Sequence, residues 1–91
     1  MEYQVIVLPT AEADLESLGT EARIGVIRRV EWLRVNSLSV IHHRLQNMPD
    51  NLAGLCRLWS GDYRILYWHY PTKKLLKVYR IQHRSEVYRS L

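Results

Sequence analysis

The stretch of residues 55–82 reads LCRLWSGDYRILYWHYPTKKLLKVYRIQ and decides the expected fold. Three segments rich in apolar and aromatic residues, 55–59, 63–70 and 75–82, are separated by short connections that hold the turn signals Ser60-Gly61-Asp62 and Pro71-Thr72-Lys73. Short connections between successive strands favour antiparallel pairing. We therefore predict a three-stranded antiparallel meander here.

The residues before this meander predict one more strand and a pair of helices. Residues 3–8 are rich in β-branched side chains and end at a proline, which is typical of a strand followed by a turn. Thr10 and Thr20 are placed to cap two helices, over residues 11–18 and from 20 to about 36. Residues 37–54 hold many turn-forming side chains and are expected to be mostly loop. The expected fold is α+β, in the order β-α-α-β-β-β, with a helical hairpin packed on a four-stranded, mainly antiparallel sheet.

Length and composition fit one small domain that spans residues 1–91. Hydrophobic residues make up 47% of the chain, which allows a packed core. A lone cysteine cannot form an internal disulfide, and neither a signal peptide nor a long apolar segment is evident, so we expect a cytoplasmic protein.

The charge of the chain is distributed unevenly. Residues 1–54 hold five basic and seven acidic side chains, a balance of −2, whereas residues 55–91 hold eight basic and two acidic ones, a balance of +6. A local positive field attracts polyanions, so contact with nucleic acid is favoured over a merely soluble basic surface.

Strand alternation predicts a cluster of arginines on one face of the sheet. If Cys56 and Leu58 face the core, then Arg57 and Trp59 face the open side. The next strand places Arg64 on that same side if residues 63, 65 and 67 face the core. A half-buried arginine needs an anionic partner, and no carboxylate is evident on this face, which favours an anion clamp for Arg64 over an arginine that snorkels at the sheet edge. The same two interpretations apply to Arg57.

Two side chains near the C-terminus can move protons. They are the imidazole of His83 and the phenol of Tyr88, and each of these groups can act as a general acid or base. The alternatives are a hydrogen-bonded surface histidine and a tyrosine that covers the sheet. Adjacent His42 and His43 would point opposite ways in an extended segment, so no metal site is expected, and Cys56 is expected to be a small core residue.

Several motifs resemble those of a known family. They are the Pro-Thr-Ala-x-x-Asp-Leu opening of the first helix, the segment LQNMPD at 45–50, the Arg-x-x-x-Gly-Asp-Tyr-Arg segment that ends at Arg64, and the block HRSEVY at 83–88. Over nearly its full length the chain resembles the RelE family of bacterial toxins, part of the RelE/ParE superfamily. The resemblance implies a compact fold related to microbial ribonucleases.

The RelE resemblance also implies an activity, namely cleavage of messenger RNA in the ribosomal A site by attack of the ribose 2′-hydroxyl, without metal or cofactor. Arg64 matches the strand arginine that stabilises the phosphate in the transition state. Tyr88 matches the C-terminal tyrosine implicated in proton transfer and base stacking, and Arg57 stands where RelE has a lysine. The chain departs from the pattern at Leu55, where a second lysine can stand, and at Gln82, where the best-known members carry a catalytic arginine.

The resulting expectation for the site has two parts. The catalytic residues are expected to be Arg64, Tyr88, His83 and Arg57, with either Tyr88 or His83 as the base and with His83 and Arg84 replacing the cation lost at Gln82. The residues expected to bind RNA are Arg44, Trp59, Lys77, Arg80 and Arg84.

The resemblance finally implies partners: a cognate RelB-type antitoxin, the ribosome with its messenger RNA, and operator DNA reached through the antitoxin complex. Two alternatives remain open. One is a ParE-like inhibitor of DNA gyrase. The other is a catalytically degenerate toxin that acts by binding its antitoxin and operator.

Overall fold

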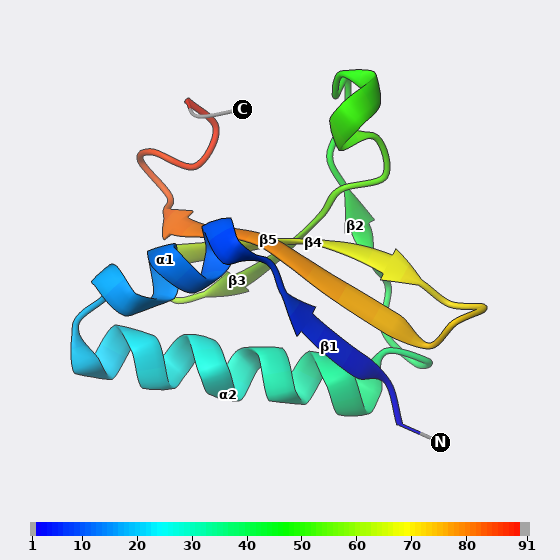
Figure 1. Cartoon of the computed structure of the whole chain (residues 1–91), viewed down its shortest axis with the longest axis horizontal. Coiled ribbons are helices and arrows are strands. Elements are labelled where there is room, and N and C mark those ends of the chain that lie inside the picture. The colour runs from blue at the N-terminus through cyan, green and yellow to red at the C-terminus, as the bar shows by residue number, and fades with distance from the viewer. Residues whose placement is uncertain (1, 90–91) are drawn as a thin grey trace.

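The computed structural model describes residues 2–89, which form two helices and a five-stranded sheet (Figure 1). No helix within these residues has the length and apolar character needed to cross a membrane. The elements, in chain order, are β1 (Gln4–Val7), α1 (Pro9–Ser17), α2 (Thr20–Asn36), β2 (His43–Arg44), the 3₁₀ turn η1 (Asp50–Leu52), β3 (Cys56–Ser60), β4 (Tyr63–Tyr70) and β5 (Leu75–His83).

The sheet confirms the meander and adds a strand that the sequence did not indicate. Its strand order is β1-β5-β4-β3-β2, with β1 parallel to β5 and all other neighbours antiparallel. The expected four strands are therefore five, because β2 lies within the segment predicted as loop. Only His43 and Arg44 pair there, opposite Arg57 and Cys56, and two residues are too few to show an alternating pattern.

The main core lies between the sheet and α2, which runs along one face (Figure 1). Its buried members come from the residue before β1, the two helices and the three long strands: Tyr3, Ala11, Val26, Leu33, Cys56, Ile65, Tyr67, Leu76, Val78 and Ile81. We call this side of the sheet the helix face. Cys56 and Ile65 are thus core residues, as strand alternation predicts.

The opposite side, which we call the open face, carries a much smaller core. Leu55, Leu66 and Val87 are fully buried there, with Trp68 and Tyr79 packed against them. In Figure 1 the C-terminal segment and the segment with η1 both rise on the side of the sheet away from α2. They leave the middle of this face less covered than the helix face.

The helix starts differ from the expected caps. The residue before α1 is Leu8 and the residue before α2 is Gly19, so Thr10 and Thr20 lie inside the first turns. The Thr10 hydroxyl instead donates to the carbonyl oxygen of Tyr79 at 2.7 Å. The end of α1 is satisfied by Arg23 of α2, whose guanidinium donates to the carbonyls of Leu15, Glu16 and Leu18.

Helix α1 also protects the exposed edge of β5. Beyond the short β1, the backbone N–H of Ile81 donates to a carboxylate oxygen of Asp14 at 2.9 Å. The guanidinium of Arg80 donates to both oxygens of the same carboxylate at 2.8 and 3.1 Å. One side chain thereby satisfies an edge donor and fixes the helix on the sheet.

Candidate functional site

Three side chains of β3 and β4 form a cation–aromatic cluster on the open face. Trp59 and Arg64 are cross-strand partners, and Arg57 lies two residues before Trp59 on the same strand. The guanidinium carbons of Arg64 and Arg57 lie 4.5 and 5.9 Å from the centre of the Trp59 ring. The indole is 55% exposed, so it presents an accessible surface beside two positive charges. The face assignment predicted from strand alternation is confirmed.

Arg64 is held in place by backbone carbonyl groups of the turn that precedes it. Its Nη1 donates to the carbonyl oxygens of Gly61 at 2.9 Å and Tyr63 at 3.2 Å. Gly61 has a positive φ of 56°, which lets the tight turn present its carbonyl to the arginine. Among residues 2–89, no carboxylate forms an ion pair with Arg64 or Arg57. The cluster can therefore accept an anion such as a phosphate.

The C-terminal segment is attached to the open face through Val87. This side chain is fully buried against Leu55 and Leu66, and its backbone N–H donates to the carbonyl oxygen of His83 at 3.1 Å. The next residue, Tyr88, is 49% exposed. Burial of Val87 therefore brings an accessible phenol to the side of the sheet that carries Arg64.

His83 lies on the other side of the sheet from Arg64. It pairs with Tyr63, and their rings meet edge to face with centroids 5.6 Å apart, while Tyr63 packs against the main core. The backbone N–H of Ser85 donates to Nδ1 of His83 at 3.2 Å, and the hydroxyl oxygen of Ser85 lies 2.9 Å from the same atom. The residue directly opposite Arg64 is Gln82.

The remaining basic residues singled out for RNA binding have diverse surroundings. Arg80 is engaged by Asp14, which raises the pKa of its guanidinium. Arg84 is exposed, with its Nε 3.6 Å from Asp62. The ammonium of Lys77 lies 5.4 Å from the centre of the Tyr70 ring, and Arg44 is exposed on β2. Only Arg84 and Arg44 combine exposure with a position next to strands β3 or β4.

The contacts of Cys56 and of the adjacent histidines 42 and 43 do not form a metal or nucleophile site among the described residues. Burial raises the pKa of the Cys56 thiol, which lies 3.4 Å from the carbonyl oxygen of Gly54. His42 turns inward, with Nδ1 2.8 Å from the Tyr67 hydroxyl and Nε2 2.9 Å from the carbonyl oxygen of Ser37, whereas His43 is exposed. Within the described residues, no group of three or more potential ligands is arranged for a metal ion.

Arg29 contacts the candidate site, although no sequence pattern predicts this contact. The Nε of Arg29, on α2, donates to the carbonyl oxygen of Trp59 at 2.9 Å. The two residues are separated by 30 positions, and helical periodicity does not indicate which strand residue an exposed helix side chain contacts.

Comparisons with known proteins agree at the level of structure. The chain matches no protein-family model, and no curated protein matches it significantly. It is similar to the toxin–antitoxin complex RelBE2 of Mycobacterium tuberculosis, at 26% identity and a TM-score of 0.76 over 93% of this chain and 94% of that one.

Two further structures show the same fold. One is the archaeal RelE–RelB complex of Pyrococcus horikoshii, with 22% identity and a TM-score of 0.71 over 96% of this chain and 100% of that one. The other is a double-arginine mutant of E. coli RelE in the free state, with 24% identity and a TM-score of 0.71 over 98% and 93% of the two chains. Over nearly its full length the chain therefore shares the fold of the RelE toxins, and the motifs that end at Arg64 and Tyr88 resemble theirs.

Proposed function

We propose that this toxin is a metal-independent endoribonuclease that cuts messenger RNA in the A site of the ribosome. The observation that carries the proposal is the Arg57–Trp59–Arg64 cluster on a RelE fold: two guanidiniums, without an ion pair among residues 2–89, lie beside an exposed indole. An indole stacks on a base and guanidiniums bind phosphate, which are the two contacts that a single-stranded RNA needs.

In the proposed reaction the ribose 2′-hydroxyl attacks the adjacent phosphorus. The 2′-oxygen loses its proton, the bond from phosphorus to the 5′-oxygen breaks, and that oxygen takes up a proton, leaving a 2′,3′-cyclic phosphate. Charge on the phosphate oxygens rises in the transition state. Arg64, whose Nη1 is already anchored to the backbone, stabilises that charge at little cost in reorganisation, and Arg57 adds a second cation.

We assign the proton transfers mainly to Tyr88 and give His83 a smaller contribution to them. Tyr88 follows the buried Val87 on the open face, which supports its access to RNA bound at Arg64. His83 contacts Tyr63 and Ser85 instead, so its Nε2 would reach RNA only at the end of the strand. Arg84 and Arg44 are proposed to contact the RNA backbone because both are exposed and basic.

We also propose a RelB-type antitoxin as partner, with operator DNA reached through their complex. The similar structures from M. tuberculosis and P. horikoshii are complexes of a toxin with such an antitoxin. In this chain, apolar side chains of β1 and α2 are exposed, among them Ile6, Ile24 and Ile27, and an amphipathic partner segment would cover them.

The test is primer extension on a message held on programmed ribosomes, with naked RNA alongside. Wild-type chain should cut at A-site codons only when the ribosome is present. Arg64→Ala should slow cutting by about 10²–10³-fold, by analogy with the loss of one oxyanion donor, and Tyr88→Phe should also slow it. An uncut message, or Arg64→Ala cutting at the wild-type rate, would contradict the proposal.

A second function is favoured by one observation. Gln82, not a cation, pairs opposite Arg64, which fits a degenerate toxin that acts by binding its antitoxin and operator. In that case the message stays intact while the chain still binds the antitoxin. A ParE-like function would instead appear as inhibition of gyrase supercoiling, so a gyrase assay on the same preparation separates the two.

A further inference from the structure

A second cation–aromatic pair lies on α2, next to the first cluster but on a different element. The guanidinium carbon of Arg29 sits 4.2 Å from the centre of the Trp32 ring, and Trp32 is 40% exposed. The same guanidinium donates through Nε to the carbonyl oxygen of Trp59. Arg29 therefore links the two exposed indoles, one on the helix and one on β3.

Three hollows run along this edge of the molecule, and Arg29 lines all of them. Their volumes are about 310, 400 and 510 Å³. The first also touches Arg57 and Trp59, the second touches Arg57 and Trp32, and the third touches Trp32 and Trp59. Because they share these residues, the hollows form one depression, which we call the Trp32–Trp59 furrow.

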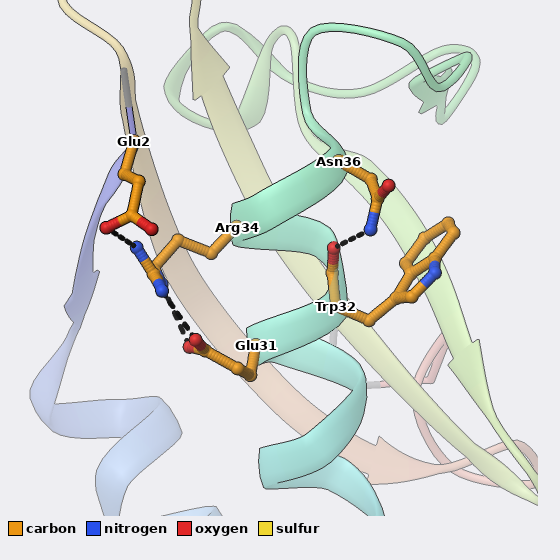
Figure 2. A network of polar contacts seen from close by, with 5 residues as sticks. All are labelled: Glu2, Glu31, Trp32, Arg34 and Asn36. Carbon is orange, nitrogen blue, oxygen red and sulfur yellow. Dashed lines mark hydrogen bonds and ion pairs between the residues drawn. The ribbon is translucent and has the colours of Figure 1, made fainter.

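The furrow is positively charged. Arg28, Arg29, Arg57 and His43 are among its lining residues, and no aspartate or glutamate of residues 2–89 lines any of the three hollows. The nearby carboxylate of Glu31 is bound by Arg34, which lowers the pKa of Glu31. Figure 2 shows that this ion-pair network lies on one side of α2 while the Trp32 indole points to the other side.

We propose that the Trp32–Trp59 furrow is a second binding site for single-stranded RNA. RNA bound on the open face would continue past β3 and contact α2 in this furrow. Bases would stack on the exposed indoles, and phosphates would contact Arg28 and Arg29. The inference rests on the proposed function only in taking RNA as the ligand, and it adds residues of α2 to an interface otherwise confined to the sheet and the C-terminal segment.

Charge and ring chemistry favour RNA over a protein segment here. A helical partner would need a continuous apolar surface, whereas guanidiniums interrupt the apolar side chains that line this furrow, among them Val40, Ile41 and Leu58. One guanidinium lies over the Trp32 ring and two lie near the Trp59 ring, yet both indoles are exposed. A single RNA strand could therefore stack its bases on the indoles and place its phosphates against the guanidiniums.

The experiment measures binding of a short single-stranded RNA that is 2′-O-methylated and therefore cannot be cut by 2′-hydroxyl attack. Fluorescence anisotropy at low salt compares wild type with Trp32→Leu, which keeps an apolar side chain but cannot stack. We expect Trp32→Leu to weaken binding by about tenfold, and Trp32→Phe by less. Arg28→Gln should reduce the slope of the logarithm of RNA affinity against the logarithm of salt concentration by about one, because one fewer counterion is released on binding.

Lys73→Gln is the matched charge control, because Lys73 is exposed in the turn at the other end of the β4 strand from Trp59. It should change affinity less than about twofold. Thermal unfolding of each variant should match wild type, since Trp32 and Lys73 are both exposed.

The inference is overturned if wild type does not bind the RNA, or if Trp32→Leu and Lys73→Gln bind equally well. It is also overturned if duplex RNA binds as tightly as the single strand, since stacking would then contribute nothing. Unchanged RNA affinity with weakened antitoxin affinity would assign the furrow to the protein partner instead. Because the RNA is uncleavable, loss of ribosomal cutting would count against the proposed function and leave this result intact.

Discussion

The two faces of the sheet differ in what fills them. The helix face buries a continuous core from both helices and four strands, and its polar groups are paired with one another. On the open face the described residues form a small buried cluster, Leu55, Leu66 and Val87, and the same face carries two guanidiniums and an exposed indole. The same strands, by alternating their side chains, supply both.

Because of this difference, substitutions on the two faces should affect stability and function separately. Buried apolar area sets most of the free energy of folding, so the helix face should dominate stability. Cations without carboxylate partners contribute little to folding but bind anions well, so substitutions on the open face should change RNA chemistry and leave the fold intact. Adjacent residues of β4 allow a direct test.

Ile65→Ala should have the largest effect on stability. Ile65 is fully buried in the main core, and its truncation leaves a cavity that should cost about 2–5 kcal/mol in the free energy of unfolding. Urea denaturation followed by tryptophan fluorescence measures this. Arg64→Ala, one residue away on the other face, is the control and should cost less than about 1 kcal/mol. Equal losses for both would abolish the distinction between the faces.

Asp14→Ala should come next, because this carboxylate fixes α1 to β5 at the margin of the helix face. The change leaves the Ile81 N–H and the Arg80 guanidinium without their acceptor and should cost about 1–3 kcal/mol. Glu12→Ala, an exposed acidic residue of the same helix, should stay within about 0.5 kcal/mol of wild type. Urea denaturation of both proteins at one salt concentration decides the outcome.

Arg64→Lys tests the open face more finely than removal of the charge. Lysine keeps the cation but loses the planar fork, the anchoring to Gly61 and the stacking on Trp59. We expect a loss of about tenfold in the rate of ribosome-dependent cutting, with unchanged unfolding. A single-turnover cleavage assay measures it, and Lys73→Arg, in the exposed turn after β4, serves as the control for changes of cation type. Full activity of Arg64→Lys would mean that charge alone suffices.

Much of the difference between the helix face and the open face could be predicted from the sequence. The turn signals at Ser60-Gly61-Asp62 and Pro71-Thr72-Lys73 define the meander, and alternation from Cys56 and Ile65 places Arg57 and Arg64 on one face. Local patterns carry this information because strand period and tight turns are properties of neighbouring residues.

The rest depends on contacts between distant parts of the chain. Strand β2 is defined only by its pairing with β3, and the Arg29–Trp59 bond joins residues 30 positions apart. A register shift between Leu66 and Tyr67 leaves Tyr79 out of the pairing and changes which residues of β5 face each side. With this register His83 pairs with Tyr63 and Gln82 pairs with Arg64. The sequence alone does not show this register, so it could not separate His83 from Arg64.

The smallest expected effect is a pH dependence that belongs to the helix face. His69 stacks on His42 with ring centroids 3.7 Å apart, and its Nε2 lies 2.7 Å from the Tyr3 hydroxyl. Burial lowers the pKa of His69, and the nearby His42 and Arg44 lower it further. The unfolded chain therefore binds the proton more readily, so stability is complete above pH ~6.5 and declines as the pH falls below it.

Urea denaturation at several pH values between 7.5 and 5 measures this decline, and His69→Asn should flatten it. His43→Asn is the matched control, because His43 is exposed on β2 and its removal should leave the slope unchanged. If His69→Asn kept the full slope, the decline would come from other groups and the stacked pair would not be its source. A flattened slope would assign the pH sensitivity of folding to the face that holds the core.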